Sequence, residues 1–292
     1  MTVRTVGLTK AYGTRLALSD VDLTVGDGSV YGLVGPNGAG KTTLLSILAG
    51  LRRPTAGTLD LGVPRKRVAV LPDTPHFEPW LTGREVVSLS AHLAAVSSPD
   101  AVDRALTGAG LADRADHRTG GYSRGMLQRL GLAATLVGDP ELLLLDEPAS
   151  ALDPAGRREV LDLISQLRGR ATVVLSSHLL GDVQEVCDTI GILRAGRLLY
   201  QGPIDSLLVG RAVPAYRLRL RSSVPAAVSA LSGLPWVRDV VALSDTDLRV
   251  LVTSLAEAEA GLPGALAAGS ARVVSLLPEE PDLEQVFLEL TS

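Results

Sequence analysis

A glycine-rich run that begins at residue 35 carries the clearest chemical signal in the sequence. It reads Gly-Pro-Asn-Gly-Ala-Gly-Lys-Thr and matches the spacing G-x-x-x-x-G-K-[ST] between an expected strand and an expected helix. Glycines lack side chains, so backbone amides can converge on phosphate oxygens, while Lys41 reaches the β- and γ-phosphates and the Thr42 hydroxyl binds Mg²⁺. The predicted phosphate-binding residues are Gly35, Pro36, Asn37, Gly38, Ala39, Gly40, Lys41, Thr42 and Thr43. An ordinary glycine-rich turn is the weaker alternative, and we expect a nucleoside triphosphate site.

Two adjacent carboxylates, Asp146 and Glu147, follow the apolar run Leu142–Leu145. A carboxylate at the end of a buried strand can hold a Mg²⁺ ion, and the neighbouring Glu147 can polarise an attacking water as a general base. Taken alone, such a run also fits a core strand that meets a loop. It lies about 105 residues after Lys41, and together with the motifs described below it predicts the hydrolytic half of the same site.

The elements that must position these residues alternate between strands and helices. Apolar runs predict strands at 30–34, 142–145 and 173–175, and the phosphate loop leads into a helix at 42–49. From Thr82 to Leu136 the pattern is helical, and Thr82 with Glu85 fits a capping box at a helix start. This alternation predicts an α/β fold of the P-loop NTPase type, with a parallel sheet and an inserted helical subdomain at about 74–138.

The rhythm of the sequence changes near residues 202–215, which predicts a domain boundary between 1–210 and 211–292. Beyond it, apolar residues alternate with Arg217, Arg219 and Arg221, which predicts a half-buried strand with one basic face. That face is most often solvated, and a regulatory or dimer contact is the alternative. The following elements are expected at 225–231, 237–242, 248–252, 256–267 and 272–276, before a last helix. The order βαββαβ predicts a small α+β domain of the ferredoxin-like type.

Composition places limits on what the chain can be. Its 292 residues suggest about two domains, and 46% hydrophobic residues with a net charge of −4 exclude intrinsic disorder. Because the charge balance is not basic, we expect no nucleic-acid partner. One cysteine excludes an intramolecular disulfide. No signal peptide or apolar run of about 18 residues is visible, so a role at a membrane would need a partner protein.

Residues 2–205 resemble the ATP-binding subunit of an ABC (ATP-binding cassette) transporter, with RecA-like core and helical subdomain. The resemblance implies that Tyr12 stacks on adenine and that His178 contacts the γ-phosphate and Glu147. It also implies that Asp153, in Ser-Ala-Leu-Asp, belongs to the D-loop that connects two sites. The signature segment would cap the ATP of the opposite subunit in a head-to-tail dimer; its residues are Tyr122, Ser123, Arg124, Gly125 and Met126. Catalysis then depends on Glu147 and His178.

Two departures from the family pattern concern the same site. The usual signature is LSGGQ, whereas this chain has Arg124 and Met126, a variant similar to those of bacterial export cassettes. Asp73 stands at the Q-loop position, where the family has a glutamine. An aspartate can ligate Mg²⁺ together with Thr42 and Asp146, but it cannot donate an amide hydrogen bond. We therefore expect coupling or turnover to differ from the family pattern.

The resemblance also implies partners and a location. A separate integral membrane permease would contact the loop at 76–81, which holds Phe77 and Trp80, and a second ATP-binding subunit would complete a homodimer on the cytoplasmic face of the membrane. The C-terminal residues 281–291 resemble the appendage of drug, antibiotic or lipid exporters. The alternatives are a soluble ABC-family ATPase that acts on ribosomes or DNA, an importer cassette, and a non-hydrolysing regulatory module.

Overall fold

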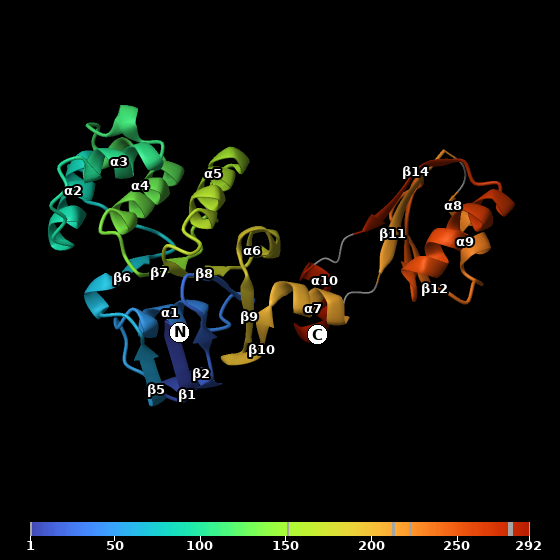
Figure 1. The fold of residues 1–292 in the computed structure, drawn as a ribbon, viewed down its shortest axis with the longest axis horizontal. Helices are drawn as coiled ribbons and strands as arrows, with labels where there is room; N and C mark the ends of the chain where they lie inside the picture. The colour runs from blue at the N-terminus through green and yellow to red at the C-terminus, as the bar shows by residue number, and fades with distance from the viewer. Residues whose placement is uncertain (1, 151, 212–213, 222–223, 280–282, 292) are drawn as a thin grey trace. The chain divides into compact units, whose positions relative to one another are not determined.

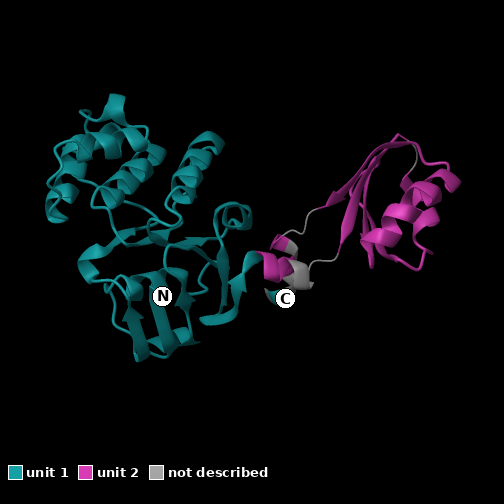
Figure 2. Cartoon of the chain, in the orientation of Figure 1, with its two compact units in different colours: residues 1–204, 290–292 teal, residues 205–289 magenta. Residues whose placement is uncertain are grey.

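The computed structural model describes residues 2–150, 152–211, 214–221, 224–279 and 283–291. These residues form two compact units, residues 1–204 with 290–292 (unit 1) and residues 205–289 (unit 2), shown in different colours in Figure 2. Residue 151 of the expected D-loop and residues 280–282 near the C-terminal motif lie outside the described part of the chain.

A six-stranded sheet forms the centre of unit 1 (Figure 1). Its order is β10-β9-β4-β8-β7-β6, in which β6, β7, β8, β4 and β9 run parallel and β10 is antiparallel. The strands are β4 (Val30–Val34), β6 (Val68–Leu71), β7 (Leu142–Asp146), β8 (Thr172–Ser177), β9 (Thr189–Arg194) and β10 (Arg197–Pro203). Every residue of β4, β7 and β8 is buried, as expected for parallel strands covered on both faces. The carboxyl ends of these strands therefore share one edge of the sheet.

A second, antiparallel sheet packs on the other side of the first helix. Its strands are β1 (Val3–Tyr12), β2 (Arg15–Val21), β3 (Thr24–Val25) and β5 (Ala56–Leu61), and β1 pairs with the other three. Helix α1 (Lys41–Leu48) lies between the two sheets, since its leucines share one apolar cluster with residues of β1, β2, β4 and β7. The helix begins one residue earlier than the sequence predicts. This packing fixes the end of α1 that follows the phosphate loop.

The helical part of unit 1 contains α2 (Gly83–Leu93), α3 (Ala101–Gly108) and α4 (Arg124–Leu136), which share an apolar cluster. Short 3₁₀ turns lie at Arg65–Arg67, Ala112–Arg114 and Thr119–Gly121. The predicted capping box is confirmed, because Thr82 Oγ1 accepts from the Glu85 N–H and a Glu85 carboxylate oxygen accepts from the Thr82 N–H. Two further helices, α5 (Pro154–Ser165) and α6 (Leu180–Val186), follow β7 and β8.

Unit 2 contains an antiparallel sheet of order β12-β13-β11-β14, with helices α8 and α9 in one core with it. Its elements are α7 (Ile204–Arg211), β11 (Ala215–Leu220), α8 (Val224–Leu231), β12 (Val237–Ala242), β13 (Asp247–Val252), α9 (Leu255–Ala268), β14 (Val273–Glu279) and α10 (Leu283–Thr291). In β11 the leucines are buried, whereas Arg217 and Arg219 are exposed. The predicted alternation on this strand is confirmed.

Candidate nucleotide-binding site

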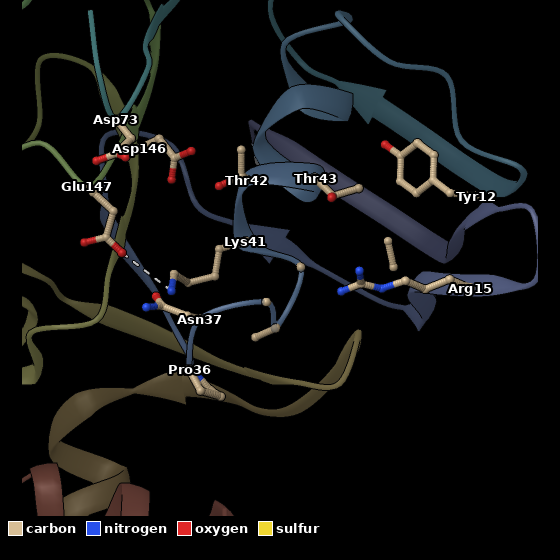
Figure 3. A pocket seen from close by; sticks show the side chains of 14 residues that line it. Tyr12, Arg15, Pro36, Asn37, Lys41, Thr42, Thr43, Asp73, Asp146 and Glu147 are labelled. Atoms are coloured by element: carbon tan, nitrogen blue, oxygen red, sulfur yellow. Dashed lines mark ion pairs between the residues drawn. The ribbon is translucent and has the colours of Figure 1, made fainter.

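An open pocket of about 440 Å³ lies at the edge of the parallel sheet where the strands end (Figure 3). Its lining comes from segments far apart in the sequence: Tyr12, Arg15, Ala17, Pro36, Asn37, Gly38, Ala39, Gly40, Lys41, Thr42, Thr43, Asp73, Asp146 and Glu147. The phosphate loop forms its floor, and three carboxylates gather at one end while Tyr12 and Arg15 lie at the other. The pocket is thus acidic at one end and basic at the other.

Two glycines of the phosphate loop are required by close contacts. A Cβ atom on Gly35 would lie 2.1 Å from the carbonyl oxygen of Leu193, and one on Gly40 would lie 2.6 Å from that of Ala17. Gly40 also has φ = 113°, a conformation that side chains disfavour, and it is the N-cap of α1. The loop therefore passes close to neighbouring backbone, and its amides lead directly into a helix N-terminus that favours anions.

Lys41, Glu147 and His178 form a chain of charged and polar contacts. The Lys41 ammonium donates to the Gly35 carbonyl at 2.7 Å and lies 3.5 Å from Glu147 Oε1. On the other carboxylate oxygen, His178 Nδ1 lies 2.7 Å from Glu147 Oε2. The side chains of Lys41 and Glu147 are only 8% and 13% exposed. The structure therefore brings together the cation, the carboxylate and the imidazole that the sequence predicts from three distant segments.

Asp146 and Glu147 differ in environment although they are neighbours. Asp146 ends β7, is 6% exposed and accepts a hydrogen bond from the Ser176 hydroxyl. Glu147 has φ = 49°, and its N–H donates to the Ser176 carbonyl and hydroxyl at 3.2 and 3.1 Å. Such a backbone is unfavourable for a side-chain-bearing residue and persists where surrounding contacts hold it. β8 extends two residues beyond the predicted strand, and this extension supplies Ser176.

Asp73 follows β6 and lines the pocket near Asp146 (Figure 3). The Ser150 hydroxyl donates to Asp73 Oδ1 at 3.4 Å, so the two loops after β6 and β7 touch. Thr42, Asp146 and Asp73 present one hydroxyl and two carboxylates to the same pocket. Oxygen donors of this kind suit Mg²⁺, so the residues present fit the predicted cation.

Tyr12, at the end of β1, lines the basic end of the pocket and is 41% exposed. The Lys10 ammonium and the Arg52 guanidinium lie 5.0 and 5.5 Å from the centre of its ring, within the range of cation–π interactions. Arg15 and Ala17 on β2 also line the pocket, and sequence reasoning missed both. A signal existed for Arg15, because a short Gly-Thr turn separates it from Tyr12.

The signature segment does not line this pocket. Tyr122 is buried, and its hydroxyl donates to the Arg114 carbonyl at 2.6 Å; burial raises its pKa. Ser123 is the N-cap of α4, where its hydroxyl accepts from the Met126 N–H at 3.2 Å. Arg124 is exposed and, with Asp73, lines a separate small hollow. Gly125 and Met126 belong to the first turn of the same helix.

Asp153 also lies outside the pocket. Its carboxylate accepts from the Gly156 N–H at 3.1 Å and caps α5, with Pro154 at the first helical position. This gives the residue a local structural role as a helix cap. The role that the resemblance implies for Asp153, a connection between two nucleotide sites, stays a prediction.

The two aromatic residues of the loop at 76–81 lie in different environments. Phe77 packs partly buried against the apolar cluster of the helical part, whereas Trp80 is 62% exposed. Phe77 also lines a groove of about 450 Å³ together with residues of β6, α2 and α4. Thus one aromatic supports the loop and the other remains available at the surface.

A parallel sheet whose strand ends carry a glycine-rich phosphate loop, an aspartate–glutamate pair and a histidine defines a P-loop nucleotide-binding protein. The sequence model of the family described as ABC transporter matches residues 18–150. Daunorubicin resistance ATP-binding protein DrrA3 of Streptomyces coeruleorubidus is 36% identical over 301 aligned residues, covering 98% of this chain and 94% of that protein. This chain therefore belongs to the family of ABC transporter ATP-binding proteins, which are ATPases.

Other similar proteins match about 70% of the chain. Bacitracin transport ATP-binding protein BcrA of Bacillus licheniformis is 36% identical over 216 residues, covering 70% of this chain and 71% of that protein. A solved structure described as the ATP binding subunit of an ABC transporter superposes with a TM-score of 0.67 at 27% identity, covering 72% of this chain and 93% of that one. The predicted cassette fold is confirmed. No helix in the described part of the chain is long and apolar enough to cross a membrane.

Proposed function

We propose that this chain is the ATP-binding and ATP-hydrolysing subunit of a membrane exporter, in which a separate transmembrane subunit moves the cargo. The observation that carries the proposal is that Glu147 contacts both Lys41 and His178 at the end of the phosphate loop, where Lys41 and Glu147 line the pocket. The named relatives support the direction of transport, because they serve drug resistance and bacitracin transport.

Binding of ATP changes the partner of Lys41. Before phosphate arrives, Glu147 neutralises the Lys41 ammonium at 3.5 Å. A β- or γ-phosphate on the loop gives the ammonium a stronger anionic partner, which frees one oxygen of Glu147. The other oxygen stays oriented by His178 at 2.7 Å, so the carboxylate can accept a proton from the attacking water as a general base.

Thr42, Asp146 and Asp73 are the residues that would hold Mg²⁺. When bound, this cation would offset the negative charge of the phosphates. The Ser176 hydroxyl keeps the Asp146 carboxylate oriented toward the pocket, and the Ser150 hydroxyl does the same for Asp73. Asp73 adds a carboxylate where the family has an amide, so cation dependence and coupling are expected to differ from the family pattern.

The active form is proposed to be a head-to-tail homodimer. Residues Tyr122 to Met126 lie outside the pocket of their own chain, while Ser123 and the amides of the first turn of α4 form a helix N-terminus suited to a phosphate. A second copy would bring this segment onto the γ-phosphate, and Asp153 would lie at the interface between the two sites. ATP would then close the dimer because it binds the closed state more tightly.

The remaining assignments concern domains and partners. We assign residues 1–210 to the ATP-binding domain, with a helical subdomain at about 74–138, and residues 211–292 to a ferredoxin-like accessory domain. The exposed Trp80 and the groove beside Phe77 suit a helix of a membrane permease, because exposed aromatic residues are enriched at interfaces. The protein would therefore work at the cytoplasmic face of the membrane, without nucleic acid.

The test is a pull-down of tagged Glu147→Gln protein from mild-detergent extracts with Mg-ATP. This variant keeps the shape of the side chain but cannot act as a base, so we expect ATP to stay bound and the dimer to stay closed. A polytopic membrane protein in stoichiometric amount is the expected partner. A matched sample without nucleotide controls for contacts that do not need closure.

Recovery of ribosomal proteins or DNA with no membrane protein would overturn the transport assignment and leave the ATP site standing. Normal turnover by Glu147→Gln would instead remove Glu147 as the base.

A further inference from the structure

We infer that Arg15 binds the α-phosphate of the nucleotide and is a second phosphate-binding cation of the site, separate from Lys41. The inference rests on the proposed ATP site and adds to it a residue that the phosphate-loop pattern does not include. It is carried by the hairpin that holds Arg15, by the unpaired charge of its guanidinium and by its place along the pocket.

The hairpin between β1 and β2 places Arg15 beside Tyr12. The two residues are direct partners in the antiparallel pair, joined by Gly13 and Thr14. Residues directly opposite each other in such a pair project their side chains on the same face, with Cβ atoms about 5 Å apart. Both side chains accordingly line the same pocket. The position of Arg15 relative to an adenine stacked on Tyr12 is thus set by backbone pairing rather than by a flexible loop.

The charge of Arg15 has no ion-pair partner among the residues that the structure describes. The side chain is exposed, and its guanidinium makes no ion pair with any residue in the described part of the chain. Lys41 differs, because Glu147 lies 3.5 Å from its ammonium. The three pocket carboxylates, Asp73, Asp146 and Glu147, lie at the far end. An unpaired guanidinium inside a nucleotide pocket is available for an anion from the ligand.

The order of groups along the pocket identifies which anion this is. Lys41 and the acidic end belong to the β- and γ-phosphates, and Tyr12 belongs to the base. The part of the nucleotide between them is the ribose and the α-phosphate. In Figure 3 the guanidinium of Arg15 points from the hairpin toward the phosphate loop. Of the two groups within its reach, only the α-phosphate carries charge, and guanidinium binds phosphate oxygens preferentially.

This placement makes the contribution of Arg15 independent of the number of phosphates. AMP, ADP and ATP all have an α-phosphate, so loss of the guanidinium should lower the binding affinity for all three nucleotides by the same factor. Loss of Lys41 should instead weaken ATP and ADP more than AMP. Adenosine has no phosphate, so the affinity for adenosine should not change when Arg15 is replaced.

The experiment compares Arg15→Gln and Arg15→Lys with the native chain. Affinities for ATP, ADP, AMP and adenosine are measured by calorimetry, with EDTA present so that no hydrolysis occurs. For Arg15→Gln we expect about a tenfold loss for each of the three nucleotides, and no change for adenosine. Arg15→Lys should lose less, since it keeps the charge but not the fork of donors.

Arg197→Gln is the matched control. Arg197 also begins the second strand of a tight hairpin in unit 1, and it is exposed, but it does not line the pocket. Its hairpin touches the phosphate loop, because the Gly196 N–H donates to the Ala39 carbonyl at 2.9 Å. The variant therefore removes the same charge nearby, and we expect unchanged affinities. An equal loss for Arg197→Gln would mean a long-range charge effect and would overturn the contact.

Two further results would overturn the inference. Unchanged nucleotide affinities for Arg15→Gln would leave Arg15 as a solvated side chain, and an equal loss for adenosine would assign it to the ribose or base. The variant Lys41→Ala distinguishes failure of the inference on Arg15 from failure of the proposed ATP site. If Lys41→Ala abolishes ATP binding while Arg15→Gln does not alter it, only the inference on Arg15 fails. If Lys41→Ala binds ATP normally, the ATP site itself is wrong.

Discussion

The two compact units use buried polar groups very differently. In unit 1 the buried side chains include Lys41, Asp146, Ser176 and Gln128, whereas in the described part of unit 2 only Asp247 is both buried and charged. Burial of a charge is unfavourable unless hydrogen bonds or an ion pair compensate it. Lys41 and Asp146 have such partners and lie at the pocket, whereas Asp182, also buried in unit 1, pairs with Arg157 outside the pocket. Among the described residues, unit 1 therefore buries more charged side chains than unit 2, and two of its three, Lys41 and Asp146, lie at the pocket.

The backbone shows the same contrast. In unit 1 the phosphate loop depends on Gly35 and Gly40, and Glu147 has a positive φ. In unit 2, strands β11 and β13 bury their apolar residues with a period of two, as an ordinary half-covered sheet does. Substitutions in the two units should therefore separate chemistry from stability.

The largest effect should come from Lys41→Ala. Loss of the ammonium removes a cation from the developing phosphate charge and leaves Glu147 without its counter-ion, so turnover should fall about 1,000-fold. ATPase assays and nucleotide binding check this expectation. Lys66→Ala, on an exposed 3₁₀ turn, is the control and should keep native turnover. Unchanged turnover in Lys41→Ala would contradict the assignment of Lys41 to the phosphates. It would also contradict the conclusion that the buried charges at the pocket of unit 1 serve the chemistry.

Leu218→Ala should affect unit 2 and leave the chemistry intact. Leu218 is fully buried in the core of unit 2, so a cavity there should lower the free energy of unfolding of this unit by about 2–5 kcal/mol. Denaturant unfolding followed by fluorescence of Trp236, which packs against that core, measures the change once Trp80 is replaced by Phe. ATP affinity should not alter. Leu277→Ala, at a side chain 60% exposed, should change stability by less than about 0.5 kcal/mol. Equal effects of the two variants would argue against the core described for unit 2.

The smallest effect concerns the helical part of unit 1. Thr82→Ala removes the hydroxyl that accepts from the Glu85 N–H at 3.2 Å and should destabilise α2 by about 1 kcal/mol. Thr82→Ser keeps the hydroxyl and should stay close to native in thermal unfolding. A loss as large in Thr82→Ser would mean that the methyl group, and not the cap, matters.

The same box has a defined pH dependence. Hydrogen bonds from the backbone N–H and the hydroxyl of Thr82 lower the pKa of Glu85 below its ordinary value of 4.5. A carboxylate with a lowered pKa stabilises the folded state fully above that ordinary value, and the contribution disappears as pH falls through the folded-state pKa. The difference in the free energy of unfolding between Thr82→Ala and the native chain should therefore be smaller at low pH than at neutral pH. Denaturant unfolding at a series of pH values measures it.

Much of the fold was predictable because its signals are local. The apolar runs predicted β4, β7 and β8, and the period of two predicted β11, each within a few residues. The phosphate loop was predictable for the same reason, since its glycines, Lys41 and Thr42 are contiguous and each backbone amide belongs to the motif itself. Glu147 was indicated by its place after an apolar run, whereas Asp73 and His178 were found only through their order in a family pattern.

The sequence by itself determined the elements and the phosphate loop, because hydrophobic period and glycine spacing act over a few residues. The tertiary structure decided which strand ends are neighbours, and so it brought Glu147 between Lys41 and His178 and linked Asp73 to Ser150. It also placed Arg15 in the pocket and Tyr122 in the core of the helical part. These contacts join residues that are distant in the chain. Which of them meet depends on the order of the strands in the sheet, and no local spacing in the sequence encodes that order.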